Sequence, residues 1–191
     1  LYLAADSSYI DIATDKGLVE TSIPTCYLTA GLVVKKNNPL KLHSIDDVLN
    51  NSSARIVLAN PEAASIGKFS KKVLSETGKW LPLSNRALVM KPTVNEIANA
   101  VKINSADVGI VWDSIVNQYD NLEFIPIDQF NKKKKLVTLG LLKSSLNKPK
   151  AMKFARYLSS IDRGQRILKK NGFEIIDGDK WEDDPSIVLY S

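Results

Sequence analysis

The sequence predicts an α/β fold with two lobes, the second inserted into the first. Apolar, β-branched runs alternate along the chain with segments of helical periodicity. Two apolar strands, at residues 27–34 and 136–142, bracket a middle block of complete strand–helix units. The alternation favours mainly parallel sheets. We therefore expect a discontinuous lobe 1 of residues 1–53 and 129–191 and an inserted lobe 2 of residues 54–128.

The first third of the chain supplies strands and helices in turn. Apolar runs predict the strands, and polar side chains that can accept a hydrogen bond from a first-turn amide predict the helix starts. The expected elements are a strand at 1–5, a helix from 6–8 to about Gly17, a strand at 27–34, a helix from Ser44 to Leu49 and a strand at 55–59.

The middle block contains the clearest start signals. Ser65 is expected to cap a longer helix with Ile66, Phe69, Val73 and Trp80 on one face, followed by a short strand at 88–90. Thr93 and Glu96 have capping-box spacing, so a second helix should begin at Thr93. Residues 108–112 then read as a buried strand, and Asp113 and Ser114 can cap the segment after it.

The last third completes the first lobe. Pro126 suits an edge position for the strand at 122–127, and a further apolar strand covers 136–142. Pro149 should open a helix whose buried face is Ala151, Phe154, Ala155 and Leu158. A final helix at 162–170 ends at an Asn-Gly pair, and the acidic, polar tail after Ile176 should lie on the surface.

Composition excludes several classes of site. The net charge of +5 mildly favours anionic partners. The dense basic run at 132–135 has no interleaved aromatics, so it reads as a solvated loop, with phosphate or membrane contact as the alternative, and not as a nucleic-acid site. Cys26 and His43 are the single cysteine and histidine, so the chain cannot form an internal disulfide or a cysteine-pair metal site.

The strongest candidate site is geometric. Ligands of open α/β sheets sit beyond the carboxyl ends of strands, where helices begin and amides lack partners. Two such starts follow predicted strands, at Ser65-Ile66-Gly67 and at Thr93-Val94. Backbone amides there, with a hydroxyl from Ser65 or Thr93, would make a neutral site for a small anion; ordinary helix capping without a ligand is the alternative. Gly67 would let a ligand approach the backbone.

Trp112 ends the buried strand at the same expected rim. Its indole could stack on a ligand or donate its N–H, and packing in the core is the alternative. No acid/base pair and none of the common catalytic motifs occurs. The sequence therefore predicts a binding protein without catalytic residues, cofactor or metal, and not an enzyme.

These residues resemble a known family, the molybdate-type periplasmic substrate-binding proteins of ABC transporters. The likeness is carried in order by Leu3-Ala4-Ala5-Asp6, Gly31-Leu32-Val33-Val34, Asn60-Pro61-Glu62 with Gly67, Ala106-Asp107-Val108-Gly109-Ile110-Val111-Trp112, and the stretch from Ala151 to Asn171-Gly172-Phe173. It implies two lobes with hinge crossings, capture of an oxyanion by neutral donors, lobe closure, and delivery to a membrane permease. It also implies a periplasmic or lipid-anchored extracytoplasmic location.

Carried over by position, the resemblance implies that Ile66 and Val94 offer backbone amides to the anion. Trp112 stands where the family usually has a tyrosine whose hydroxyl binds the anion, and Ser65 replaces a residue that is often proline. The family begins with two strand–helix units, carrying two serine donors, before the segment that matches Leu1. Lobe 1 is therefore expected to be incomplete, with chain exchange as one way to complete it.

One alternative keeps the two-lobed fold but changes the function. The effector domain of a LysR-type transcriptional regulator senses a small molecule with the same architecture. A helix-turn-helix upstream of Leu1 would favour the regulator, and a secretory or lipoprotein signal there would favour the transport protein.

Overall fold

The computed structural model describes residues 1–181, and these form two compact units. Unit 1 contains residues 1–28 together with the described residues from 135 on, and unit 2 contains residues 29–134. One unit is thus inserted into the other, but the predicted boundaries at 53/54 and 128/129 move to 28/29 and 134/135. The reason is that β3 (Ala30–Lys35) pairs with strands of the second unit.

Unit 1 is built on a four-stranded antiparallel sheet with the order β1-β8-β2-β9. Its strands are β1 (Tyr2–Ala4), β2 (Val19–Leu28), β8 (Lys135–Leu142) and β9 (Glu174–Ile175). The long central pair β2–β8 makes up most of this sheet, because β1 and β9 each add only a short strand to it.

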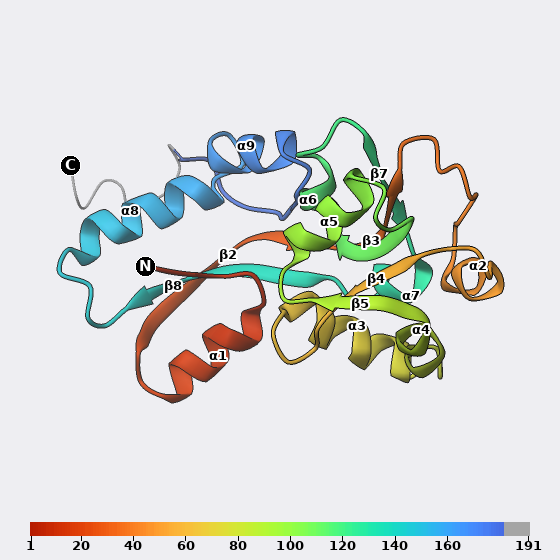
Figure 1. Cartoon of the computed structure of the whole chain (residues 1–191). Helices are drawn as coiled ribbons and strands as arrows, with labels where there is room; N and C mark the ends of the chain where they lie inside the picture. Colours follow the sequence, from red (N-terminus) through yellow and green to blue (C-terminus); the bar gives the residue numbers. More distant parts are fainter. Residues whose placement is uncertain (182–191) are drawn as a thin grey trace. The chain divides into compact units, whose positions relative to one another are not determined.

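Helices cover both faces of this sheet. Ile10 of α1 (Ser7–Asp15) packs with Ala4 and Val19, whereas Ala155 of α8 (Lys148–Ser159) packs with Ile23 and Leu139. Figure 1 shows α1 and α8 on opposite sides of β2 and β8, with α9 (Gly164–Lys170) beside α8. The predicted buried face of α8 is therefore wrong in part. The stripe that meets the sheet is centred on Ala155, and the Phe154 side chain is 56% exposed.

The predicted single strand at 27–34 is wrong, because the chain changes sheets within it. β2 ends at Leu28 and β3 begins at Ala30, so the two halves lie in different units. The sequence signal for the rest of β2 was weak, since Pro24 interrupts it and its first half is polar. A bulge between Pro24 and Cys26 accommodates the proline in the ladder.

Unit 2 contains a five-stranded mixed sheet with the order β5-β4-β6-β3-β7. Three neighbouring strands run parallel, namely β5 (Ala87–Lys91), β4 (Ile56–Ala59) and β6 (Val108–Trp112). β3 is antiparallel to both of its neighbours, β6 and β7 (Leu122–Pro126). The predicted mainly parallel pairing thus holds only for the first three strands, because alternation along the chain does not reveal that β3 inserts between β6 and β7. β7 does lie at the sheet edge.

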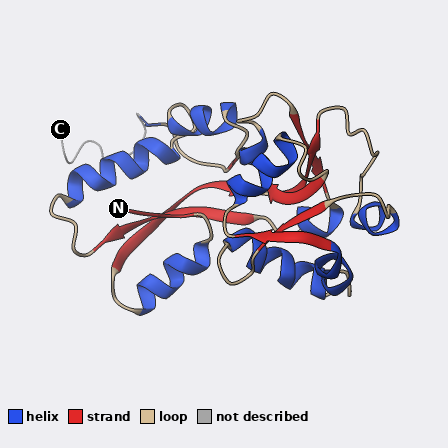
Figure 2. Ribbon diagram, viewed as in Figure 1, coloured by secondary structure: helices blue, strands red, loops and turns tan. Residues whose placement is uncertain are grey.

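Helices also cover both faces of the second sheet (Figures 1 and 2). Ile97 of α5 meets Gly109 on one face, and Phe69 of α3 meets Trp112 on the other. Gly78, with φ +68°, ends the predicted long helix before Trp80. Trp80 is therefore the first residue of a separate helix. The helices are α2 (Ile45–Asn50), α3 (Ser65–Ser75), α4 (Trp80–Arg86), α5 (Val94–Lys102), α6 (Asp113–Val116) and α7 (Asp128–Asn131).

Residues 1–181 contain neither a membrane-spanning helix nor a metal-binding cluster. No helix in this range has the length and apolar character needed to cross a bilayer. No group of three or more histidine, cysteine or acidic side chains in the same range could hold a metal ion. The predicted surface tail falls largely at residues 182–191, which lie outside the described part of the chain.

An ion pair holds the amino ends of β4 and β6 together. The Arg55 guanidinium donates to both carboxylate oxygens of Asp107, with Nη2–Oδ1 2.7 Å and Nε–Oδ2 3.0 Å. The Arg55 amide also donates to Asp107 Oδ2 at 2.9 Å. These hydrogen bonds, of which those from the guanidinium have the largest effect, hold the pKa of Asp107 below its ordinary value.

We predict that Asp107→Asn lowers Tm by roughly 2–4 °C at neutral pH, because the charge-assisted pair is lost. Since the folded-state pKa of Asp107 is lowered, its stabilising contribution is complete above the unfolded pKa and disappears as pH falls through the folded pKa. Calorimetry from pH 7 to pH 2 should therefore show the two proteins converging in acid. Asp120→Asn, at an exposed acid, is the control. A wild-type advantage that persists at pH 2 would contradict the assignment.

Candidate functional site

The carboxyl ends of three parallel strands form one edge of unit 2. β4 leads to α3, β5 to α5 and β6 to α6, so all three helices begin along this edge. The Asn60 amide donates to the Lys91 carbonyl at 2.8 Å, which holds the end of β4 to the end of β5. Every predicted ligand residue lies at this edge: Ser65, Ile66, Gly67, Thr93, Val94 and Trp112.

The N-terminus of α3 has no side-chain cap. Ala64, in extended conformation with φ −125°, is the N-cap residue, so Ser65 is the first helical residue and not the predicted cap. The first intrahelical bond of this turn runs from the Lys68 amide to the Ala64 carbonyl at 3.1 Å. Within residues 1–181, no acceptor takes the amide hydrogens of Ser65, Ile66 and Gly67. These three donors, with the positive end of the helix dipole, favour a negative group.

Gly67 allows a backbone contact inside the protein. A Cβ built at this residue would lie 2.7 Å from the Ala59 carbonyl oxygen and 2.7 Å from the carbonyl carbon and oxygen of Asn60. The missing side chain thus lets the first turn of α3 lie against the end of β4. The expected approach of a ligand to Gly67 is therefore not possible from this side, because the chain's own backbone fills the space.

The loop between β4 and α3 is shaped by Asn60, which the sequence places in a turn but which was not among the predicted ligand residues. Its Oδ1 accepts the Glu62 amide at 2.9 Å, and its carbonyl accepts the amides of Ala63 at 3.1 Å and Ala64 at 2.9 Å. These bonds turn the chain tightly into α3. The Asn-Pro pair at 60–61 is the signal that predicts this turn from the sequence.

Thr93 caps the start of α5 as predicted, but the reciprocal half of the capping box, a bond from the Thr93 amide to the Glu96 carboxylate, is not formed within residues 1–181. Thr93 Oγ1 accepts the Glu96 amide at 3.3 Å and lies 2.9 Å from a Glu96 carboxylate oxygen. The Thr93 cap occupies the Glu96 amide, whereas the amides of Val94 and Asn95 have no acceptor in the described part of the chain. A capped helix start therefore still presents two donors at this edge.

Trp112 is packed into the protein. Only 6% of it is exposed, and its ring lies 5.3 Å from that of Phe69, which in turn lies 5.8 Å from the Phe130 ring. Of the two roles that the sequence allows for Trp112, core packing and ligand contact, the structure contains the packing. Phe69 appeared in the sequence only as one apolar position on a helix face, so its central place could not be recognised.

Charged side chains at this edge are few. Lys68 and Glu62 are exposed, and Asp113 accepts the Thr29 amide at 3.2 Å and the Ser114 amide at 2.8 Å. Asp113 is thus engaged in holding backbone. Among the residues that the structure describes, this edge therefore offers mainly backbone amide donors, and no paired acid and base lies beside them.

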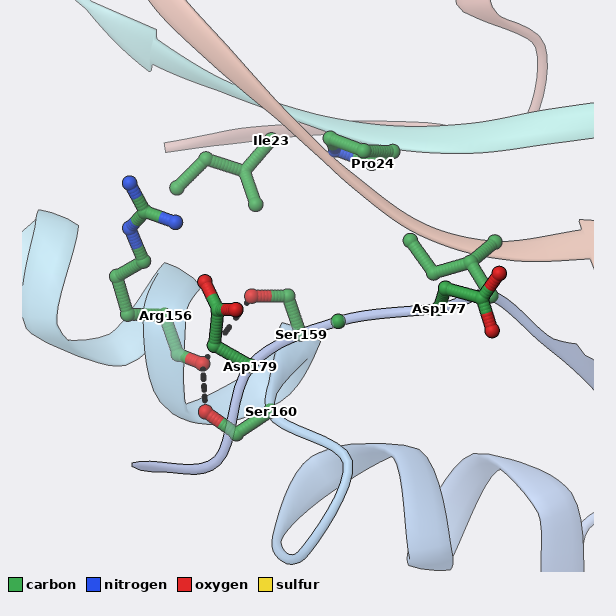
Figure 3. Close-up of a pocket in the computed structure, with 9 residues that line it drawn as sticks. Ile23, Pro24, Arg156, Ser159, Ser160, Asp177 and Asp179 are labelled. Atoms are coloured by element: carbon green, nitrogen blue, oxygen red, sulfur yellow. Dashed lines mark hydrogen bonds between the residues drawn. The ribbon is translucent and has the colours of Figure 1, made fainter. Parts of the chain in front are cut away.

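A separate cavity of about 190 Å³ lies in unit 1 (Figure 3). β2, the end of α8 and residues 176–179 line it, and Figure 3 shows Arg156 and Asp179 reaching into it. None of the predicted ligand residues lines this cavity. Two carboxylates, from Asp177 and Asp179, accompany the single guanidinium, which makes it a poor site for an anion.

Comparison with known proteins gives concordant results. A family model described as bacterial extracellular solute-binding protein matches residues 1–174. The molybdate-binding protein ModA of Escherichia coli strain K12 is 26% identical over 181 residues, with 92% of this chain and 70% of that protein covered.

Two solved structures extend the comparison. The periplasmic molybdate-binding protein of Azotobacter vinelandii has a TM-score of 0.74 at 18% identity, covering 92% of this chain and 78% of its own. The sulfate-binding protein SubI of Mycobacterium tuberculosis also has a TM-score of 0.74, at 16% identity. The match covers 92% of this chain and 68% of SubI. At these identities the likeness shows the fold alone, which is the predicted periplasmic-binding-protein-like class. The LysR-type alternative is not favoured.

We predict that Gly67→Ala destabilises the protein by about 2 kcal/mol, because the new methyl group must displace the backbone at residues 59–60. The measurement is urea unfolding of both proteins. Gly78→Ala is the matched control: no atom lies within 4 Å of its Cβ position, so only its φ of +68° opposes the change, at a cost of roughly 1 kcal/mol. Equal stability of wild type and Gly67→Ala would contradict the close contact.

Proposed function

The chain belongs to the family of bacterial extracellular solute-binding proteins, and from that premise we propose that its ligand is a small oxyanion of the molybdate type. The members of this family are binding proteins of ABC transporters and not enzymes. The protein would capture the anion outside the cytoplasm, from the periplasm or from a lipid-anchored position, and deliver it to a permease.

One observation carries the proposal: five amide donors that have no acceptor within residues 1–181 lie at the ends of neighbouring strands. Ser65, Ile66 and Gly67 contribute three at the start of α3, and Val94 and Asn95 contribute two at the start of α5. Adjacent strands are about 4.8 Å apart, so two helix starts that follow adjacent strands can serve one small ligand. The names of the relatives, molybdate-binding and sulfate-binding, support an oxyanion as that ligand.

A site made of N–H groups selects its ligand by hydrogen bonding. An oxyanion that has lost its protons accepts from every donor, whereas a protonated form would place a donor against a donor. Ser65 adds a hydroxyl that can donate as well. Trp112 replaces the tyrosine expected from the resemblance, so we propose that the backbone amides supply most of the binding energy here.

We predict that molybdate or sulfate raises Tm of the wild-type protein, and that Val94→Pro weakens binding by about 10- to 100-fold. Proline at the first helical position removes one N–H without breaking the helix, and a hydrogen bond to a charged group is worth roughly 1.5–3 kcal/mol. Thr93 is already extended, with φ −133° and ψ 151°, as a residue before proline must be. Isothermal titration calorimetry gives the affinities.

Val94→Ala is the matched control, because it shortens the same side chain but keeps the amide hydrogen. Its affinity should stay within about threefold of wild type. The site assignment fails if the proline and alanine variants bind the anion equally well. The oxyanion assignment fails if molybdate, tungstate and sulfate all leave the wild-type Tm unchanged.

A further inference from the structure

We propose that Phe69 couples the anion site to both segments where the chain passes between the two units. This inference rests on the proposed function for its ligand, but the contacts that carry it are independent of any ligand. Phe69 lies in α3, one turn after the uncapped amides of Ser65 and Ile66, and is 7% exposed. A shift of the first turn of α3 must therefore move a buried ring.

The first connection runs through Trp112 to the segment at 28/29. The ring of Trp112 lies 5.3 Å from that of Phe69, at an interplanar angle of 39°. The next residue, Asp113, forms a reciprocal pair with Thr29: the Asp113 amide donates to the Thr29 carbonyl at 2.9 Å, and the Thr29 amide donates to Asp113 Oδ2 at 3.2 Å. Thr29 is the first residue of unit 2, so this pair holds the chain where it enters the unit.

The second connection runs through Phe130 to the segment at 134/135. Phe130 is fully buried, and its ring lies 5.8 Å from that of Phe69. The Lys133 amide donates to the Phe130 carbonyl at 2.9 Å, and the Lys133 ammonium pairs with Glu76 at the end of α3. Lys134 is the last residue of unit 2, so these contacts hold the chain where it leaves the unit.

Phe69 is thus a positioning residue. Its ring contacts Trp112, which leads to the segment at 28/29, and Phe130, which leads to the segment at 134/135. Tightly packed aromatic side chains move together, because a gap between rings forfeits their contact energy. An anion that fixes the first turn of α3 should therefore also steady both passages. Conversely, a smaller side chain at Phe69 should loosen them even when no ligand is present.

The test is amide hydrogen exchange of the whole chain, read at Thr29 and Lys133, in wild type, Phe69→Leu and Val73→Ala. Val73 is a buried residue one turn further along α3 and serves as the control for general loss of packing. We expect both reporter amides to exchange about tenfold faster in Phe69→Leu than in Val73→Ala without ligand. We also expect molybdate or sulfate to slow both amides in wild type, and less so in Phe69→Leu.

Equal exchange rates at Thr29 and Lys133 in Phe69→Leu and Val73→Ala would overturn the coupling. If Phe69→Leu does not fold, Phe130→Leu replaces it, and the coupling then requires faster exchange at Lys133 with Thr29 unchanged. If wild type binds neither molybdate nor sulfate, the proposed function fails, while the ligand-free comparison still decides the coupling.

Discussion

The site depends on one close contact between two pieces of backbone. The first turn of α3 lies against the last peptide of β4, at a distance that leaves no room for a Cβ at Gly67. The N-cap residue is Ala64, whose methyl side chain cannot accept a hydrogen bond from the first amides of the helix. The donors of this turn thus keep their capacity for an outside acceptor, while the glycine fixes where they lie relative to the sheet.

The order of strands supplies the second half of the arrangement. β5, β4 and β6 are parallel neighbours, so the helices that follow them all begin at one edge of unit 2. Backbone donors at such an edge give a ligand no acid, base or nucleophile, and this agrees with a family of binding proteins. The aromatic chain through Phe69 then offers a physical route from these donors to the two passages between units. Binding and conformational response would therefore share one helix.

Local signals in the sequence predicted the parts of the fold that depend on near neighbours. The Thr93 cap of α5, the Ser44 cap of α2 and the edge position of the strand with Pro126 all follow from residues within a turn of one another. The long-range features could not be read this way. The last residues of β2 and the whole of β3 form one apolar run, and only pairing with distant strands separates them at Thr29. The antiparallel insertion of β3 has the same cause.

In the candidate site, too, the local features were predicted and the long-range contacts were not. Spacing placed Ile66 and Val94 at helix starts after strands, and both residues lie there. Gly67 was predicted to let a ligand approach, because the sequence cannot show that the chain's own peptide occupies that side of the glycine. The partnership of Phe69 with Trp112 was equally hidden, since 43 positions separate them and each alone is an ordinary core aromatic.

The central claim is that the amides at the starts of α3 and α5, which have no acceptor in the described part of the chain, bind the anion. Its most direct test is a titration of ¹⁵N-labelled protein with molybdate, and with sulfate, followed by amide chemical shifts. The account predicts that the largest shifts fall on the amides of residues 65–67 and 94–95, all with one binding constant. Saturable shifts centred elsewhere, for example around the cavity at Arg156, would contradict it.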